Sequence, residues 1–170
     1  MTRSNWGKSM RMIYLHLVAL ASLLPAQDKT SIHVLDACED TTQWRTFQSA
    51  GVIVSQHRDI GESGGAIRFD VAFTKGSGYG GIVRTFDITL PENYELSFSL
   101  RATIPLNNFE VKLSNDTLGE NIWWVNKKNY AYPSQWKRIH VKKRHLSFAW
   151  GPRSAPAPDA LRRLELVVTA

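Results

Sequence analysis

The sequence has one cysteine in 170 residues, Cys38. A single thiol cannot close an intrachain disulfide, and it cannot supply a zinc site built on cysteines. The five histidines show neither an HExxH pattern nor closely paired ligand spacing, and no GxSxG nucleophile motif is present. These absences argue against a zinc hydrolase and against a serine hydrolase of the common strand–turn–helix type.

Long hydrophobic runs and helical periodicity are also missing. The longest nearly apolar stretch, Met12–Leu24, is too short to cross a bilayer of about 30 Å. It follows three basic residues and no acidic residue, as the apolar region of a signal peptide does. Cleavage could follow Ala21 or Ala26, so we expect residues 1–26 to be a signal peptide and the protein to be secreted or periplasmic. An uncleaved anchor or a buried helix is the alternative.

Charge of one sign is not in large excess. The chain has 21 basic and 15 acidic residues, hence +6, and residues 1–26 hold three of the basic residues and no acid. The remaining +3 argues against a nucleic-acid partner, although basic and aromatic residues interleave around Lys137–Arg138 and Lys142–His145. An acidic polysaccharide could use the same residues.

The rest of the sequence predicts short strands separated by turn residues. Apolar and polar residues alternate clearly in Ala66–Phe73, Tyr94–Thr103 and Phe109–Ser114. The other expected strands are Ser31–Leu35, Gly51–Gln56, Gly80–Ile88, Ile122–Asn126, Trp136–Lys143, Leu146–Trp150 and Leu161–Thr169. This spacing predicts a single all-β domain over residues 27–170, an antiparallel sandwich or barrel.

Six blocks follow one another over residues 34–170: Asp36–Asp40 with Trp44, Gly78–Ile82, Pro91–Phe98, Asn108–Leu113, Asn121–Asn126 and Lys142–Pro152. In this order they resemble the galactose-binding-like jelly-roll modules, some of them discoidin-like, at the N-termini of secreted bacterial carbohydrate-active proteins. The resemblance implies an antiparallel jelly-roll β-sandwich. It also implies a non-catalytic carbohydrate-binding module of an exported glycan-processing protein, whose parent could be a glycoside hydrolase.

Two departures from the family pattern matter. Cys38 stands where the family usually has Phe. The Asp-bearing strand that closes such modules has no counterpart, because the sequence stops within an apolar strand. We therefore expect a module truncated at its C-terminus that lacks its last strand, with an open edge beside Leu164–Thr169.

Aromatic residues are the first candidate ligand contacts, because aromatic rings stack on the apolar faces of sugars. Adjacent Trp123 and Trp124 must point to opposite faces of a strand, so only one of them can be a sugar platform. Trp124, which shares a face with Ile122 and Asn126, is the candidate, and burial of both indoles is the alternative. Tyr79, next to a glycine-rich turn, is a second candidate platform.

Polar residues on strand faces are the second set of candidates. Glu110 and Lys112 share one face of their strand, and the resemblance places that face on the concave sheet that often holds the ligand. Such side chains can hydrogen-bond sugar hydroxyls or a uronate, although cross-strand ion pairs on a solvated face explain them equally. The predicted ligand contacts are Tyr79, Glu110, Lys112, Trp124, Asn126 and Arg144.

The resemblance also implies a structural calcium ion near the first and last strands. Asp36, Glu39 and Asp40 offer the hard oxygen ligands that calcium prefers, and Glu39 and Asp40 are the expected ligands. An Asx-capped turn is the alternative reading of the same acidic residues.

Two other classes of function stay open. A structural or protein-docking sandwich without sugar binding would show an exposed apolar patch instead of a polar surface. A stand-alone glycosidase would need two carboxylates about 5–10 Å apart, and Glu110 has no acidic partner on its own strand. We expect no enzymatic activity from this chain alone, a polysaccharide or oligosaccharide as ligand, no nucleic-acid partner and no membrane span.

Overall fold

Short antiparallel strands make up the structure, a computed structural model that describes residues 32–152 and 155–170. The elements are η1 (Thr41–Gln43), β1 (Arg45–Gln48), β2 (Val52–Ile60), β3 (Gly65–Phe73), β4 (Tyr79–Thr89), β5 (Glu95–Leu100), β6 (Asn107–Ser114), β7 (Ile122–Tyr130), β8 (Lys137–Lys142), η2 (Lys143–His145), β9 (Ser147–Trp150) and β10 (Ala160–Thr169). Within the described residues, no helix is long and apolar enough to cross a membrane.

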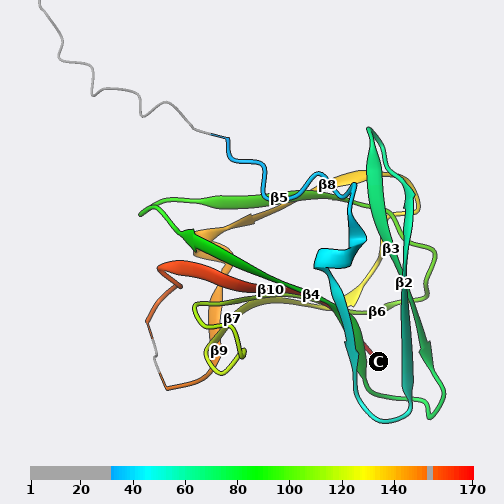
Figure 1. Ribbon diagram of the computed structural model, residues 1–170. Coiled ribbons are helices and arrows are strands. Elements are labelled where there is room, and N and C mark those ends of the chain that lie inside the picture. The colour runs from blue at the N-terminus through cyan, green and yellow to red at the C-terminus, as the bar shows by residue number, and fades with distance from the viewer. Residues whose placement is uncertain (1–31, 153–154) are drawn as a thin grey trace, which may run out of the picture. The chain divides into compact units, whose positions relative to one another are not determined.

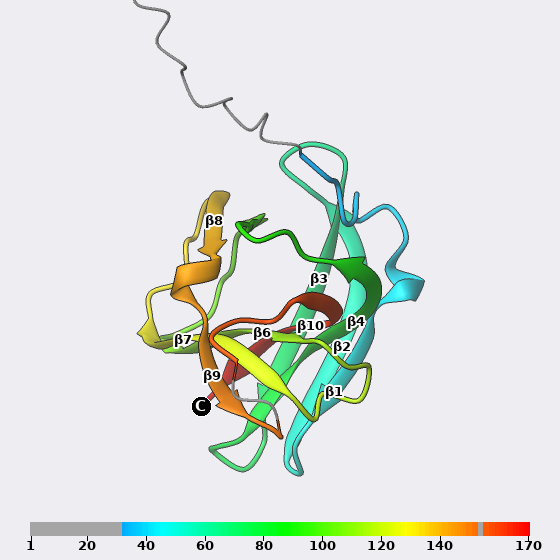
Figure 2. The ribbon, with the colours of Figure 1, turned by 90° about the vertical axis from the view of Figure 1, so that its left-hand side faces the viewer.

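Six of the strands form the main sheet, in the order β1-β4-β10-β6-β7-β9. The remaining strands form two antiparallel pairs, β2–β3 and β5–β8. Figure 1 shows β5 and β8 opposite the main sheet, with β2 and β3 crossing at one side. Turning the molecule shows β8 again apart from β6 and β10 (Figure 2). This two-layer arrangement confirms the predicted antiparallel β-sandwich.

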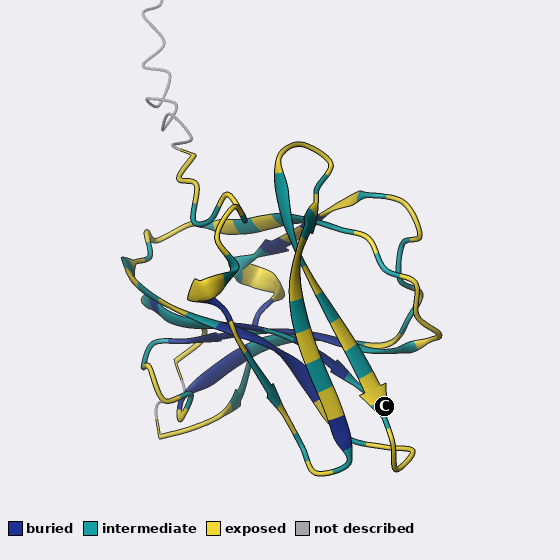
Figure 3. Cartoon of the chain, turned by 45° about the vertical axis from the view of Figure 1, so that its right-hand side comes forward, coloured by how far each residue is buried: buried dark blue, intermediate teal, exposed yellow. Residues whose placement is uncertain are grey.

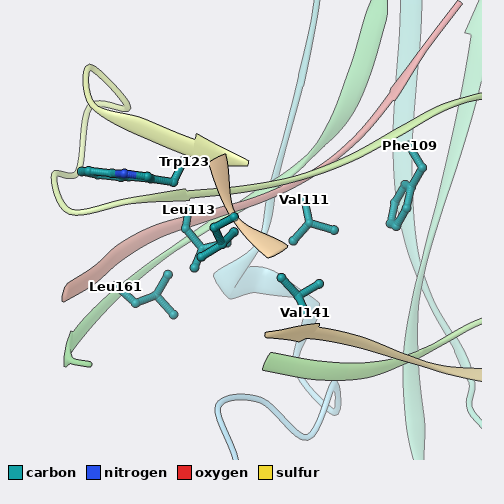
Figure 4. Close-up of a cluster of buried hydrophobic side chains, with 7 residues drawn as sticks. Phe109, Val111, Leu113, Trp123, Val141 and Leu161 are labelled. Atoms are coloured by element: carbon teal, nitrogen blue, oxygen red, sulfur yellow. The ribbon is translucent and has the colours of Figure 1, made fainter. Parts of the chain in front are cut away.

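The hydrophobic core lies between the main sheet and the β5–β8 pair. Phe109, Val111 and Leu113 of β6 are almost completely buried and belong to one cluster with Val141 of β8 (Figure 4). Burying a side chain of this size contributes roughly 1.5–3 kcal/mol. Side chains alternate along a strand, so the residues between these point away from β5 and β8. We call that side of the main sheet the outer face.

The β2–β3 hairpin shows the expected alternation directly. Exposed and partly buried residues alternate along β3, as the sequence predicted for Ala66–Phe73, and Figure 3 shows the hairpin as alternating teal and yellow bands. Its apolar side covers one end of the main sheet, because a side chain at Gly80 of β4 would meet Val54 and Val71. The hairpin therefore closes the sandwich on the core side of β4.

The last strand, β10, lies inside the main sheet between β4 and β6. The open edge predicted beside Leu164–Thr169 is therefore wrong, because these residues are paired on both sides. Ala170 and Gly78 also exchange two backbone hydrogen bonds of 3.1 Å. The edges of the main sheet are instead the four-residue strands β1 and β9, and short edges limit pairing with other chains.

The other predicted strands from Gly51 onward correspond to β2–β10, with ends that shift by up to four residues. Two differences are larger. Residues 32–35 contain no strand, and Arg45–Gln48 forms a strand that the sequence did not predict. The predicted signal peptide, residues 1–26, lies outside the described residues. Residues 34–170 form one compact unit.

Candidate functional site

The register of the main sheet brings five of the six predicted ligand contacts to the outer face. Glu110 lies opposite Asn126, and Lys112 lies opposite Trp124, in the β6–β7 pair. Tyr79 joins them from the start of β4, because β10 pairs in register with both β4 and β6. The predicted alternation of the two indoles is confirmed: Trp123 is fully buried on the core side, whereas Trp124 is partly buried on the outer face.

Glu110 is the centre of a polar cluster on this face. Glu110 is only 5% exposed, and one of its carboxylate oxygens lies 2.9 Å from the ammonium of Lys112. The other oxygen accepts a hydrogen bond of 3.2 Å from the side-chain amide of Asn126. A buried carboxylate is tolerable only with such partners, so the sheet itself satisfies this charge.

A second buried ion pair comes from β10. Glu165 lies opposite Lys112 in the β10–β6 pair, and its carboxylate accepts a 2.6 Å hydrogen bond from the guanidinium of Arg163. The sequence analysis missed both residues as site candidates. Alternation within Leu161–Thr169 could have placed them on one face, but nothing in the sequence says that β10 lies beside β6. Two cations and two carboxylates therefore balance at the middle of the outer face.

Pairs of aromatic rings stand on both sides of this polar centre. Trp124 of β7 and Trp150 of β9 have ring centroids 5.9 Å apart, and Phe47 of β1 lies 6.3 Å from Tyr79 of β4. Trp150 and Tyr79 are each 44% exposed. Strands β10 and β6 separate the two pairs, so β4 and β7 are about 14 Å apart at the usual strand spacing.

The two carboxylates bear on the hydrolase alternative. Glu110 and Glu165 are diagonal neighbours on adjacent strands, which places them about 7 Å apart, within the range that glycosidases use. Each carboxylate, however, is held by a cation and is nearly buried. Neither is presented to a glycosidic oxygen, so the arrangement suits positioning of a ligand better than acid–base chemistry.

Arg144 lies away from the other five predicted contacts. Strand β8 ends at Lys142, and Lys143–His145 then form a 3₁₀ turn that takes Arg144 off the strand. Its exposed side chain lines a separate hollow of about 430 Å³, together with Glu92, Asn93, Lys143, Leu146, Pro156 and Ala157. The sequence carried no signal for this turn, because Lys142–His145 is polar throughout.

The expected calcium ligands have protein partners. Glu39 binds the guanidinium of Arg58 at 2.5 Å and accepts a 2.8 Å hydrogen bond from the amide of Gly65, and these contacts lower its pKa. Asp40 caps the first 3₁₀ turn by accepting from the hydroxyl and amide of Thr42, which lowers its pKa. Within the described residues, no three acidic, histidine or cysteine side chains gather to hold a metal, and the calcium site stays a prediction.

The third acidic residue of this segment, Asp36, is partly buried. Burial raises its pKa, but hydrogen bonds from the Trp44 indole at 2.6 Å, the amide of Cys38 and the guanidinium of Arg84 outweigh it, so the net pKa is lowered. Cys38 itself is half-buried, and burial raises the pKa of its thiol. This segment therefore anchors the chain to β4.

Comparison with known proteins identifies the fold. Two solved structures share it, both family 11 carbohydrate-binding modules of Clostridium thermocellum. One belongs to a cellulosomal cellulase, with 18% identity over 80% of this chain and 84% of that one and a TM-score of 0.62. The other is in complex with a β-1,3-1,4-mixed-linked tetrasaccharide, with 17% identity over 79% and 84% and a TM-score of 0.65. No family model and no curated protein matches the sequence. The chain thus has the predicted jelly-roll β-sandwich fold of these modules.

Proposed function

We propose that the protein is a non-catalytic carbohydrate-binding module that holds a polysaccharide chain on the outer face of its main sheet. The observation that carries the proposal is the pairing of a partly buried and an exposed aromatic ring, Trp124 with Trp150 and Phe47 with Tyr79, on either side of a polar centre. Rings of this kind stack on the apolar faces of sugars, while amide and charged groups bond the hydroxyls.

The charge balance of the outer face favours an uncharged sugar chain. Lys112 with Glu110, and Arg163 with Glu165, already form ion pairs. A uronate placed among them would compete with these carboxylates for the same cations, whereas a hydroxyl can donate to a carboxylate oxygen without displacing its partner. The distance between the aromatic pairs suits a chain of several sugar residues lying across the strands.

The shared fold supports this proposal and suggests a first probe. One of the two similar modules is described in complex with a β-1,3-1,4-mixed-linked tetrasaccharide, and the other comes from a cellulase. Mixed-linked glucan is therefore the neutral ligand that we would test first. Export of the protein and its attachment to a glycan-processing partner belong to the same proposal, and both rest on the sequence.

The test is calorimetric titration of the module with mixed-linked glucan and with a panel of other neutral glycans. We expect Trp124→Ala to weaken binding about 30-fold, because a tryptophan anchor contributes 2 kcal/mol or more. Tyr79→Ala reports the opposite aromatic pair without touching the indoles. Ile53→Ala, which trims another exposed large side chain on β2, is the matched control and should bind as the wild type does.

Two results would contradict the proposal. If no neutral glycan binds, or if neither aromatic variant changes the affinity while circular dichroism shows folded protein, the sandwich serves docking or structure instead. If the module releases reducing ends from glucan, and Glu110→Gln abolishes that release, the protein is a hydrolase.

A further inference from the structure

Two connections meet at one end of the sandwich, away from the polar centre of the outer face. Residues 101–106 join β5 to β6, and residues 131–136 join β7 to β8 (Figure 1). Leu100 pairs with Lys137 and Asn107 pairs with Tyr130, so all four strands bring their ends together here. A 2.8 Å hydrogen bond from the amide of Ala102 to the carbonyl of Pro133 holds the two connections against each other.

This end is rich in basic residues, and one acidic residue lies beside it: Glu62 of the β2–β3 turn accepts a hydrogen bond from Ser99, which pairs with Arg138. Residues 121–158 include eight basic residues and no acidic one. Residues 96–109 also include no acidic residue. We call the group Arg101, Lys127, Lys128, Lys137 and Arg138, with the two connections, the basic end. In the described part of the chain none of these five cations takes part in an ion pair, although Arg138 donates to the hydroxyl of Ser97. Cations that have no acidic partner within the protein attract anions.

Aromatic rings lie directly beneath two of these cations. The Arg101 guanidinium is 4.7 Å from the centroid of the Trp136 ring, and the Lys127 ammonium is 5.0 Å from that of Tyr130. Stacking on a ring orients the guanidinium and leaves its N–H groups free at the edge for a planar carboxylate or a sulfate. These contacts therefore pre-position the charge without neutralising it.

A hollow of about 380 Å³ opens between the same two connections. Its lining residues are Ala102, Thr103, Ile104, Pro105, Tyr132 and Ser134. Apolar walls with a few hydroxyl groups match the two sides of a sugar ring, and the volume falls within the range of small-ligand sites. Arg101 precedes the hollow along one connection, and Trp136 and Lys137 follow it along the other.

We propose that the basic end is a second binding site, which takes an anionic polysaccharide bearing uronate or sulfate groups. It is separate from the outer face, which we assign to a neutral glycan, and it does not depend on that assignment. A sugar ring seats in the hollow, and its acidic substituent is met by Arg101 and Lys137. Nucleic acid would satisfy the charges too, and an unstacked base would need a free ring face. The ring in this hollow, Tyr132, already packs against Phe109 and Tyr130, so the hollow suits a sugar better.

Binding to labelled polygalacturonate at low ionic strength tests the site. We expect Arg101→Gln/Lys137→Gln to bind about tenfold more weakly, because two charge-assisted contacts are lost. Lys137→Gln alone has a matched control in Lys75→Gln, which removes another exposed lysine from the β3–β4 turn and should bind as the wild type does. Arg101→Lys keeps the charge but loses the planar guanidinium fork. Its affinity for polygalacturonate should therefore fall between that of the wild type and that of the double variant. Trp124→Ala should leave polygalacturonate binding unchanged.

Three outcomes would overturn the proposal. Polygalacturonate binding that is unaffected in the folded double variant places the contact elsewhere. Equal weakening by Lys143→Gln/Arg144→Gln assigns it to the other basic hollow or to charge in general. Tighter binding of single-stranded DNA, with the same dependence on Arg101, makes the partner a nucleic acid. Failure of the outer-face proposal is read separately, from neutral glucan and Trp124→Ala.

Discussion

The outer face and the basic end use the same pair of components, a cation beside an aromatic ring, in opposite ways. Lys112 lies 5.3 Å from the Trp150 ring centroid and forms an ion pair with Glu110, so its charge is neutralised within the sheet. Arg101 lies 4.7 Å from the Trp136 ring centroid and, within the described residues, has no carboxylate partner. Residue types alone do not distinguish the two surfaces.

Burial explains the difference between the two surfaces. A charge placed among the crowded side chains of a six-stranded sheet must be paired, since an unpaired one is costly there. A charge on a connection keeps its water and needs no partner. We therefore expect the outer face to discriminate shape and hydroxyl position in its proposed ligand, and the basic end to discriminate net charge.

The largest expected effect comes from removing the cation of the outer face. Lys112→Met leaves the Glu110 carboxylate buried beside the indoles without its ammonium partner, and we expect the free energy of unfolding to fall by about 3 kcal/mol or more. Lys137→Met, at the basic end, should change it by less than about 0.5 kcal/mol. Urea denaturation of both variants measures this contrast.

A double variant separates the ion pair from simple loss of packing. Glu110→Gln introduced into Lys112→Met removes the orphaned charge, so part of the lost stability should return. If Lys112→Met and Lys137→Met are equally mild, the outer-face pair is as solvated as the basic end, and the contrast between the two regions fails.

Asp36 is another charge that is paired within the protein, and replacing it should lower the free energy of unfolding somewhat less than Lys112→Met does. Asp36→Asn weakens its bonds to the Trp44 indole and to Arg84, and we expect a loss of about 2 kcal/mol at pH 7. The folded-state pKa of Asp36 lies below its ordinary value of 3.8, so this stability is present above about pH 4 and is lost as the pH falls through the folded-state pKa.

The measurement is the stability difference between the wild type and Asp36→Asn from pH 7 down to pH 2. The difference should shrink steadily below pH 4, when the Asp36 carboxylate takes up its proton. A difference that stays constant over this range would show that the carboxylate charge makes no contribution through Arg84.

The fold was largely predictable because alternation is a local property. The pattern of Phe109, Val111 and Leu113 against Glu110 and Lys112 indicated both a strand and its buried side, and the structure agrees. Strand β1 was missed because Arg45–Gln48 is too short for a period to show. The open edge was predicted wrongly because position in the sheet depends on pairing between strands far apart in the sequence, and β10 pairs with β4 and β6.

The candidate site was predictable only where its residues share a strand or an adjacent pair of strands. Glu110, Lys112, Trp124 and Asn126 come from β6 and β7, which are consecutive and joined by a short connection. Phe47, Arg163 and Glu165 reach the same face through β1 and β10, which nothing local in the sequence connects to β6. The sequence indicated Tyr79 because it lies next to a glycine-rich turn. Its contact with the Phe47 ring is seen only in the structure.

Salt provides the last and smallest contrast between the two regions. Exposed cations act through long-range attraction that dissolved ions screen, with a Debye length of about 10 Å at 0.1 M and about 3 Å at 1 M. Raising sodium chloride from 50 to 500 mM should weaken polygalacturonate binding about tenfold and leave neutral glucan binding within about twofold. The outer-face ion pairs are buried, so dissolved salt weakens them little. The affinities for the two ligands should therefore diverge in one salt titration of the wild type. Glucan binding that falls as steeply as polygalacturonate binding would mean that a single charged surface takes both ligands.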